Sequence, residues 1–395
     1  MANQRHRTEQ IRRSRNSKAR RGGRVVGLGI TAGGLLALGL TPLATAPRAH
    51  ADVEDIFQPV IDAIAQAINV VDPSLASSLD PGLDAGSAAA ALPAAVAENA
   101  TIPLTMVNTD PEVDISVGGG PDIPVVADTG SVGLMVPWND VGLPNLFTLF
   151  SNLSHLTLET TGYGSSPAGP NIDILYVQDP NTTVDFGNGI VTTPTTVDLA
   201  LFEYPASNSD LLNWHDYSLP GYLSGVNADG FLGLGAEPTL VGPPGDSVVT
   251  ALPGDLGEGV LINETGGYLE FGPNPLSVYT SLLGAPLTLD LQVSVGGGGY
   301  TTVDVATIDS GGTDGTIPAD ILVGNPAVGQ PLSSGTEISV ETSQGQFLYS
   351  YVTSAAHSPT ISSDSTMNTG WAPFQAYPVY ISYSPTNLGT TVFDY

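Results

Sequence analysis

Two short segments of this chain follow the same pattern, and together they constrain its fold more than any other feature. The first, Ile123–Ser131, reaches Asp128 at the end of an apolar run and turns at once on Thr-Gly. The second, Val303–Gly311, reaches Asp309 in the same way and turns on Ser-Gly. One such Asp is an ordinary turn residue. Two of them, in corresponding positions of the two halves of one domain, predict a pair of carboxyl groups that act together.

A matching hairpin signal precedes each of the two acidic turns. The sequence Ser-Val-Gly-Gly-Gly occurs at 116–120 and again at 294–298. The Ser of the first copy stands 12 residues before Asp128, and that of the second stands 15 residues before Asp309. A hairpin that carries an Asp to the same place in two halves is the trace that an internal duplication leaves. A generic secreted β-sandwich with two coincidental acidic turns is an alternative, but it leaves the repeated hairpin unexplained.

From residue 101 onward the sequence predicts an all-β structure. Short runs rich in Val, Ile, Thr and Tyr alternate with Gly, Pro and Asn turns, and no long helical pattern interrupts them. We expect an N-terminal lobe at residues 101–272 and a C-terminal lobe at 273–395, with a short helix at Ser247–Leu252. The clearest strand signals are Thr182–Phe186, Thr195–Phe202, Tyr268–Phe271, Glu337–Val340 and Val379–Tyr383.

The residues before the β region read as an export signal and a connection. Residues 1–51 hold a basic region up to Arg24, an apolar stretch from Val25 to Leu43 and a small-x-small cleavage signal ending at Ala51. The Arg20-Arg21 pair leaves twin-arginine and general secretory export both open. Residues 52–73 predict one amphipathic helix, either packed on the main domain or acting as a removable prosegment. Residues 74–100, rich in Ala, Pro, Gly and Ser, predict a linker.

Charge is distributed very unevenly along this chain. All ten Lys and Arg residues lie at or before Arg48, and subtracting Glu9 from the 39 acidic residues leaves 38 carboxyls after that point. Only His155, His215 and His357 can supply positive side-chain charge there. Nucleic acid is therefore excluded as a partner of this part, and anionic membrane surfaces are disfavoured. The acidity serves solubility alone, or it suits a protein that works in acid and melts higher at mildly acidic pH.

Other features limit the remaining possibilities. The chain has no Cys, so disulfides do not stabilise it. After the signal no segment is apolar enough to span a bilayer, so we expect no stable membrane insertion. Calcium loops at Asp309–Gly315 or Asn227–Gly230 lack the spaced ligand set of such sites, and the His residues lack zinc spacing. We therefore expect no metal and no cofactor.

Two carboxyls a few ångströms apart hold one proton between them, because both cannot ionise cheaply. One can then act as a base on water while the other polarises a carbonyl, which hydrolyses an amide. The sequence leaves open which Asp holds the proton. In support, the Thr129 and Ser310 hydroxyls can bond across to the other lobe or to backbone, and Ser131 can donate to a carboxylate. Gly130 and Gly311 are expected to let the backbone turn tightly behind each Asp.

Several segments resemble pepsin-like aspartic proteases. Asp128–Pro137 resembles the first active-site segment of that family and Ile308–Gly312 the second; the further matches are Ala228–Gly235, Tyr268–Gly272 and Tyr377–Tyr383. With its export signal and no Cys, the chain is most similar to mycobacterial cell-envelope aspartic proteases fused to PE domains, although no recognisable PE domain precedes residue 101. The resemblance implies a pepsin-like fold, two pseudo-twofold-related lobes with a cleft between them, and catalysis by Asp128 and Asp309.

The resemblance also implies a flap, and it shows three departures. The flap residues are expected to be Tyr163 and Gly164, with Tyr176 as the competing tyrosine. Met135 stands where pepsins carry an active-site Trp, and Gly312 stands where a Thr or Ser usually follows the second Asp-Ser/Thr-Gly. No clear second hydrophobic-hydrophobic-Gly segment stands near Trp371.

The sequence therefore predicts an exported aspartic endopeptidase of the cell envelope, cell surface or medium. It is expected to be a monomer that binds extended polypeptides by strand-like pairing, including its own chain if it processes itself. Because no Lys or Arg lines the cleft, apolar or neutral residues are expected at the cut site. The alternative is a non-catalytic envelope protein that keeps the fold for binding. Such a protein would need neither Asp.

Overall fold

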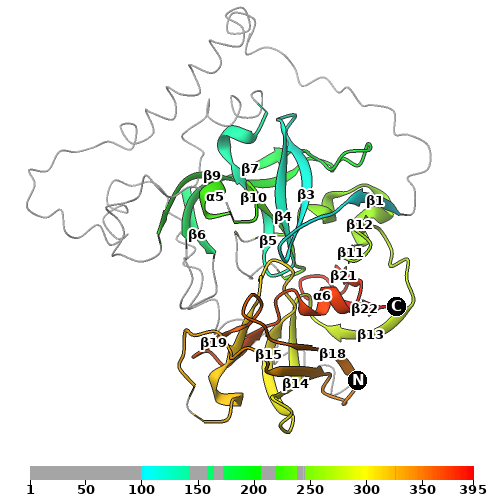
Figure 1. Ribbon diagram of the computed structural model, residues 1–395. Coiled ribbons are helices and arrows are strands. Elements are labelled where there is room, and N and C mark those ends of the chain that lie inside the picture. The colour runs from blue at the N-terminus through cyan, green and yellow to red at the C-terminus, as the bar shows by residue number, and fades with distance from the viewer. Residues whose placement is uncertain are drawn as a thin grey trace, which may run out of the picture.

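The computed structural model describes residues 99–142, 158–163, 172–205, 219–223, 225–237, 243, 245–324 and 326–395. The predicted signal peptide, the amphipathic helix and nearly all of the linker lie outside these residues. The described part consists mainly of strands, with only short helices, so the all-β prediction is confirmed (Figure 1). None of the described helices is long and apolar enough to cross a membrane.

A nine-stranded sheet carries the first acidic turn (upper half of Figure 1). Its central strand β4 ends at Asp128 and pairs antiparallel with β3 and parallel with β10. In spatial order the strands are β2 (Thr105–Val107), β3 (Asp110–Val117), β4 (Asp122–Asp128), β10 (Gly230–Leu234), β5 (Val132–Pro137), β9 (Thr195–Pro205), β7 (Ile172–Thr182) and β6 (Leu158–Tyr163), with β8 (Val184–Asp185) beside β3.

A seven-stranded sheet carries the second acidic turn (lower half of Figure 1). Strand β15 leads to Asp309, pairing antiparallel with β14 and parallel with β20. The order is β18 (Phe347–Val352), β17 (Glu337–Glu341), β14 (Leu287–Val295), β15 (Thr301–Thr307), β20 (Thr366–Asn368), β16 (Thr316–Pro318) and β19 (Thr360–Ser362). The arrangement around β15 therefore repeats that around β4.

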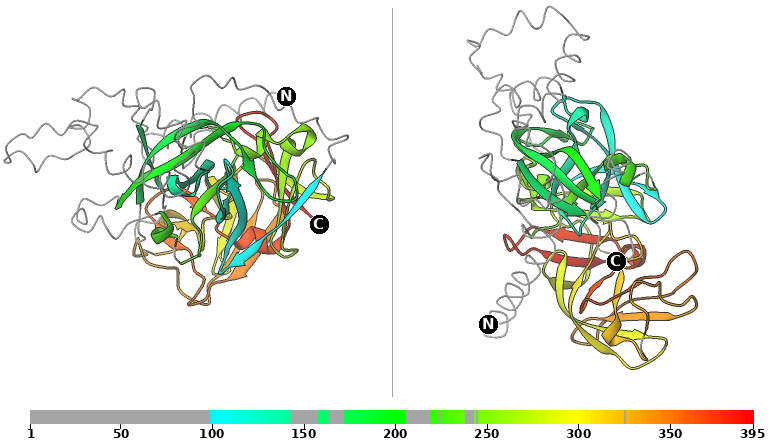
Figure 2. Two further views of the ribbon diagram at one scale, coloured as in Figure 1. Left: turned by 90° about the horizontal axis from the view of Figure 1, so that it is seen from above. Right: turned by 90° about the vertical axis from the view of Figure 1, so that its left-hand side faces the viewer.

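A six-stranded sheet joins the two parts of the chain and runs along one side of the molecule (Figures 1 and 2). It pairs β11 with β21, so strands on both sides of the predicted boundary at residue 272 share one sheet. Its order is β1 (Ala100–Pro103), β12 (Tyr268–Phe271), β11 (Gly259–Asn263), β21 (Val379–Ser382), β22 (Thr390–Asp394) and β13 (Val278–Leu283). The lobe boundary itself stays a prediction.

The short helices fill corners between these sheets. They are α5 (Leu219–Tyr222), α6 (Ala372–Ala376) and the 3-10 turns η2 (Trp138–Asp140), η5 (Val248–Ala251), η6 (Gly254–Glu258) and η7 (Ala319–Ile321). Turn η5 lies inside the helix predicted at Ser247–Leu252. Among the predicted strands, Tyr268–Phe271 has the observed bounds, while Thr182–Phe186 is divided between β7 and β8.

The two repeated hairpins have the same local structure. In both, two consecutive glycines adopt positive φ: 58° and 76° at 118 and 119, and 63° and 70° at 296 and 297. The Ser of each copy donates to the carbonyl four residues later, with Ser116 bonding Gly120 at 2.7 Å and Ser294 bonding Gly298 at 2.8 Å. The shared Gly residues are thus explained by turn geometry, since Gly adopts these φ values at no steric cost, and the shared Ser is explained by its bond across the turn.

The core is continuous through the base of both acidic turns. Ala127 and Ile308, which directly precede the two Asp residues, are completely buried in one large apolar cluster. A second cluster, which includes Met135 and Tyr176, packs beneath the β6–β7 hairpin. Burial at this level holds each Asp by close-packed apolar neighbours.

Candidate active site

The two acidic turns are bonded to each other by reciprocal hydrogen bonds. Thr129 N–H donates to Ser310 Oγ, and Ser310 N–H donates to Thr129 Oγ1, both at 3.0 Å. Each hydroxyl then donates to the strand leading into the opposite turn: Thr129 to the Ile308 carbonyl at 2.8 Å and Ser310 to the Ala127 carbonyl at 2.6 Å. Both side chains are completely buried. These four bonds fix the turns relative to each other.

The glycines of the turns make room for the opposite carboxyl. A Cβ atom at Gly130 would lie 2.4 Å from the Asp309 carboxyl, and one at Gly311 would lie 2.7 Å from the Asp128 carboxyl. Neither glycine has a positive φ. The expected reason for these glycines, a tight backbone turn, is therefore replaced by another: each must lack a side chain because the other Asp packs against it.

The two carboxyls lie in one buried environment. Asp128 is 7% exposed and Asp309 is 8% exposed. Burial raises the pKa of Asp128, while the Ser131 hydroxyl, Asp309 and the Gly130 N–H oppose that rise. Burial and the neighbouring Asp128 charge raise the pKa of Asp309 further above its usual range. Both carboxyls therefore ionise with difficulty, and the pair is expected to hold one proton between them.

The donors to each Asp differ between the halves. Gly130 N–H donates to Asp128 Oδ1 at 2.7 Å. The Ser131 hydroxyl is buried and makes no close hydrogen bond within the described residues, but it lies near enough to Asp128 to lower its pKa. On the other side, Asn368 Nδ2 donates to Asp309 Oδ2. Sequence reasoning missed Asn368 because it is 59 residues from its partner.

Strand β20 locates the second counterpart of the hydrophobic-hydrophobic-Gly segment, which the sequence did not show clearly near Trp371. In the first half, Gly233 of Phe231-Leu-Gly233 lies opposite Asp128. In the second, Asn368 lies opposite Thr307, and Thr369 N–H bonds the Thr307 carbonyl at 3.0 Å. The counterpart of the hydrophobic-hydrophobic-Gly segment is therefore Asn368-Thr-Gly370, whose polar residues concealed it in the sequence.

These features match one known family. Residues 100–391 match the model of the PE-PGRS C-terminal aspartyl peptidase-like domain. The chain belongs to this family. The resemblance predicted from the acidic turns is thereby confirmed.

Curated relatives carry the name PE cleavage protein A. The protein from Mycobacterium tuberculosis is 41% identical over 309 residues, which cover 75% of this chain and 52% of the relative. The one from Mycobacterium marinum is 42% identical over 306 residues, covering 74% and 52%. The chain thus spans about half the length of these relatives. A solved aspartic proteinase from Irpex lacteus aligns with 75% of this chain and 97% of its own, with 12% identity and a TM-score of 0.44.

The predicted flap falls on the β6–β7 hairpin of this aspartyl peptidase-like domain. Tyr163 ends β6 and its backbone pairs with Ile172, while its side chain and Gly164 lie outside the described residues. The competing Tyr176 is completely buried in the cluster that contains Met135. Tyr176 is therefore a core residue and cannot close over a substrate. Met135 is likewise a core residue, without the polar N–H that a Trp would bring.

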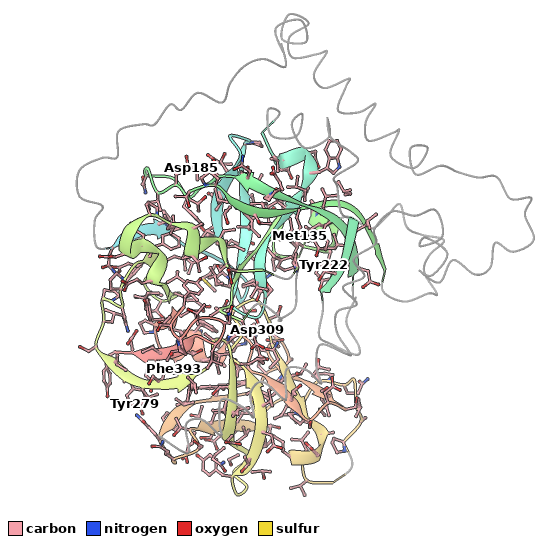
Figure 3. The ribbon with its side chains drawn as sticks, turned by 180° about the vertical axis from the view of Figure 1, so that it is seen from behind. Met135, Asp185, Tyr222, Tyr279, Asp309 and Phe393 are labelled. Atoms are coloured by element: carbon pink, nitrogen blue, oxygen red, sulfur yellow. The ribbon has the colours of Figure 1, made fainter. Side chains whose placement is uncertain are left out.

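Tyr222 is a second residue near the site that the sequence did not indicate. It ends α5, and its ring lies 6.4 Å from that of Phe231. Burial raises the pKa of Tyr222, and the charges of Asp128 and Asp110 raise it further, which places its hydroxyl near the first acidic turn. Figure 3 shows Tyr222 on the side of the nine-stranded sheet, with Asp309 at the junction with the other half.

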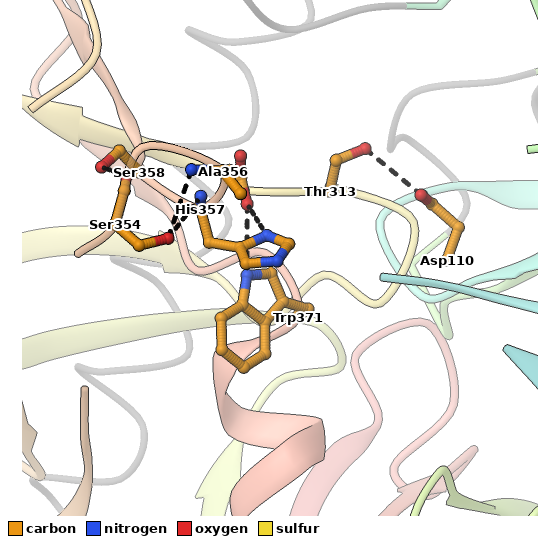
Figure 4. Close-up of polar contacts among 8 residues, drawn as sticks. Asp110, Thr313, Ser354, Ala356, His357, Ser358 and Trp371 are labelled. Carbon is orange, nitrogen blue, oxygen red and sulfur yellow. Dashed lines mark hydrogen bonds and ion pairs between the residues drawn. The ribbon is translucent and has the colours of Figure 1, made fainter. Parts of the chain in front are cut away.

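A buried carboxyl stands behind the second acidic turn. Thr313 Oγ1 donates to Asp110 Oδ1 at 3.3 Å, linking that turn to β3 (Figure 4). Asp110 is 4% exposed, and burial, with Asp128 as a further contributor, raises its pKa to about 7. Burial likewise raises the pKa of Glu264 to about 8, with Asp110 contributing.

On the outer side of the same turn, Asp314 binds two aromatic groups. His357 Nδ1 lies 3.2 Å from Asp314 Oδ1, and Trp371 Nε1 donates to the same oxygen at 3.3 Å (Figure 4). His357 is thus a hydrogen-bonded surface residue, whereas His155 and His215 lie outside the described residues. Within the described ranges no group of three or more His, Asp or Glu side chains could hold a metal ion.

The reciprocal bonds give a stability prediction. Thr129→Val keeps the shape of the side chain but leaves the Ile308 carbonyl and the Ser310 N–H without their partner. We expect the free energy of unfolding, measured with urea, to fall by roughly 2–4 kcal/mol, because each unpaired buried group costs about 1–3 kcal/mol. Thr193→Val, which removes one exposed bond to the Ala251 carbonyl, is the control. Equal stability losses in both variants would contradict this account of the turns.

Proposed function

We propose that this protein is an exported aspartic endopeptidase in which Asp128 and Asp309 hydrolyse peptide bonds. The observation that carries the proposal is the reciprocal bonding of the two turns, which brings two buried carboxyls together. The second supporting fact is charge: no Lys or Arg occurs after Arg48, so the carboxyls tune mainly each other. A scaffold kept only for binding has no use for such a pair.

The proposed chemistry assigns the role of base to Asp128 and the role of acid to Asp309. Ionised Asp128 takes a proton from a water molecule, whose oxygen attacks the peptide carbonyl carbon. Asp309 donates its proton to the carbonyl oxygen, which gives a neutral tetrahedral intermediate. The intermediate then collapses as Asp128 passes its proton to the leaving nitrogen and Asp309 recovers one from a hydroxyl. No covalent bond to the protein forms, and no metal or cofactor is needed in this cycle.

The substrate is proposed to be an extended polypeptide. Strand β6 forms an edge of the nine-stranded sheet, and edge pairing gives affinity through the peptide backbone. With no cationic side chain among the described residues apart from His357, neutral or apolar residues are favoured at the cut site. The relatives' name refers to cleavage of PE, so PE-containing polypeptides are the first substrates to test, together with the chain itself.

Export to the envelope, cell surface or medium is part of the proposal. Its support is the basic region before Arg24, followed by the apolar stretch and the Ala49-His-Ala51 signal. Expression with residues 1–51 intact should give a secreted product with a new N-terminus near Asp52. An N-terminal sequence that retains residues 1–51 on secreted protein would contradict this assignment.

The activity itself is tested with the purified chain on a peptide library between acid and neutral pH, scored by mass spectrometry. We expect internal cleavages that a pepstatin-type inhibitor suppresses, because such inhibitors occupy the acid pair. If the wild-type protein cuts nothing that an Asp128→Asn variant leaves intact, but still binds extended peptides, the non-catalytic binding alternative holds.

A further inference from the structure

Asp309 has a partner that its own turn does not supply. Asn368 Nδ2 donates to Asp309 Oδ2 at 2.5 Å. Asn368 is the last residue of β20 and lies opposite Thr307 of the parallel strand β15. Because β15 leads straight to Asp309, the pairing of these strands delivers the Asn368 side chain to the carboxyl.

The orientation of the Asn368 amide is determined by a second bond. Its Oδ1 atom accepts the Gly370 N–H at 2.9 Å. A backbone N–H can only donate, so the amide atom that faces Gly370 must be oxygen. The NH₂ group therefore faces Asp309, and the assignment does not depend on choosing between two equivalent flips.

Gly312 provides the space for this arrangement. A Cβ atom at Gly312 would lie 2.5 Å from Asn368 Oδ1 and 2.9 Å from Asp309 Oδ2. A Ser or Thr at 312, which is usual in pepsin-like proteases, could not coexist with Asn368 in this position. Gly312 and Asn368 thus form a complementary pair. The Asn368 side chain occupies the space that a Ser or Thr side chain at 312 would need, which explains why Gly stands there.

An amide differs chemically from the hydroxyl that it replaces. A hydroxyl can donate to a carboxylate or accept from a protonated carboxyl, whereas an NH₂ group only donates. While the Asn368 bond is made, Asp309 Oδ2 must therefore present a lone pair. Asp309 Oδ1 is buried without a close hydrogen-bond partner among the described residues, and it remains free to carry a proton.

We propose that Asn368 is a positioning residue that holds Asp309 Oδ2 as an acceptor and so directs the proton of the acid pair to Oδ1. The proposal rests on the proposed function and goes further, because it assigns the proton to one oxygen atom. Asp128 is the charged neighbour of Asp309, and Asp110 and Tyr222 are the titratable groups that face Asp128. Asn368 is uncharged, so its effect on the pair is exerted through the hydrogen bond alone.

The first test is Asn368→Ala, assayed on a peptide that the wild-type protein cleaves. Losing a hydrogen bond to a charged group should lower kcat by about 10- to 100-fold. KM should change much less, because the residue contacts the acid pair and not the peptide. The alkaline limb of the pH profile of kcat/KM, which reports loss of the proton held by Asp309, should move to higher pH by about one unit, since the donor favours ionised Asp309.

A double-mutant cycle with Gly312→Ser makes the test specific. Gly312→Ser alone should lower both kcat and the melting temperature, because its Cβ collides with Asn368. In the Asn368→Ala background the 2.5 Å contact with Asn368 Oδ1 is gone, and only the 2.9 Å approach of the Cβ to the Asp309 carboxyl end remains to be relieved. The new Ser hydroxyl can then donate to Asp309. We expect it to raise kcat and to return the pH profile towards that of the wild type. A substitution that is harmful in both backgrounds would overturn the complementary-pair argument.

Asn263→Ala is the matched control. Asn263 also accepts a backbone N–H, from Gly266 at 2.7 Å, and donates its NH₂, to Tyr268 at 3.0 Å, but it lies on β11. It should lower the melting temperature without moving the pH profile. If Asn368→Ala behaves in the same way, Asn368 is merely structural and the proposal fails.

A readout independent of turnover separates this proposal from the proposed function. The carboxyl ¹³C signal of Asp309, assigned by its loss in Asp309→Asn, is titrated in the wild type and in Asn368→Ala. A higher apparent pKa in the variant supports the positioning role even if no peptide is cleaved. An unchanged titration overturns that role even if the protein proves to be an active protease.

Discussion

Asp128→Asn is expected to lower kcat/KM for peptide cleavage by about 10³-fold or more, because an amide cannot take a proton from water. Asp309→Asn should cause a similar loss, because an amide cannot supply the acidic proton. The effects of the two substitutions should not add in the double variant, since both residues act in one proton-transfer unit. The measurement is steady-state cleavage of a single fluorogenic peptide at the optimum pH of the wild type.

The same substitutions are expected to increase stability at neutral pH. Both carboxyls are buried and crowded, which raises their pKa values, and an amide in either place removes the cost of burying charge. Loss of activity with an equal or higher melting temperature is the signature of a site that trades stability for function. Asp185→Asn, at an exposed turn on β8, is the control and should change neither property.

Two outcomes would count against this assignment. Cleavage by Asp128→Asn at more than about a tenth of the wild-type rate would remove Asp128 from the chemistry. Intact-mass analysis must accompany the assay, because trace deamidation of the new Asn would restore the wild-type Asp. If a variant has a lower melting temperature and its unfolded fraction accounts for all of the lost activity, the Asp is required for structure and not for catalysis.

The melting temperature of the protein is expected to be highest near about pH 4 and to fall steadily towards about pH 8. Burial raises the pKa of Asp110 to about 7, that of Glu112 to about 7 and that of Glu264 to about 8. These groups bind protons more tightly when folded than when unfolded. Their stabilising contribution is therefore complete below the unfolded pKa, near 4, and is lost as the pH rises through 7 to 8.

The size of the effect can be bounded from Asp110, which is 4% exposed. Its raised pKa corresponds to at most roughly 4 kcal/mol between acid and neutral pH. Acid unfolding by positive repulsion should be weak, since no Lys or Arg follows Arg48.

Asp110→Asn isolates this contribution. An amide stays neutral at every pH and can still accept from Thr313, so the variant should gain stability over the wild type at pH 8 and little at pH 4. The free energy of unfolding should depend less steeply on pH in the variant, by the equivalent of up to about one bound proton between pH 4 and pH 8. A wild-type melting temperature that rises from acid to alkaline pH would contradict the account, as would an Asp110→Asn variant with an unchanged slope.

Much of the site was predictable because it is local in sequence. Each Asp stands at the end of its own strand, and each hairpin that delivers it is encoded by adjacent Ser, Val and Gly residues. The positive φ values at Gly118 and Gly296 arise from this short-range pattern. The reason for Gly130 was not predictable in the same way. Its neighbour is the carboxyl of Asp309, far away in sequence, and a single-sequence pattern contains no information on that distance.

The tertiary structure also removed one of the two tyrosines that could act as a flap. The sequence favoured Tyr163 and left Tyr176 as its competitor, and β6 and β7 pair so that Tyr176 is buried in the apolar cluster. Strand registers of this kind assign alternate side chains to opposite faces, and a shift of one residue would reverse the choice. The side chain of Tyr163 keeps its predicted role as a hypothesis.

By itself, the sequence determined that this chain is a β protein with two related acidic turns and no later Lys or Arg to neutralise them. Those facts depend on neighbours in the chain and on composition. Only the tertiary structure decided what surrounds the two carboxyls. Asn368 reaches Asp309 because β20 pairs with β15, and Asp110 reaches Thr313 across 203 residues. Such contacts are made by sheet pairing and packing between segments remote in sequence. The two Asp residues could therefore be predicted from the sequence, whereas the side chains that set their hydrogen bonds and pKa values could not.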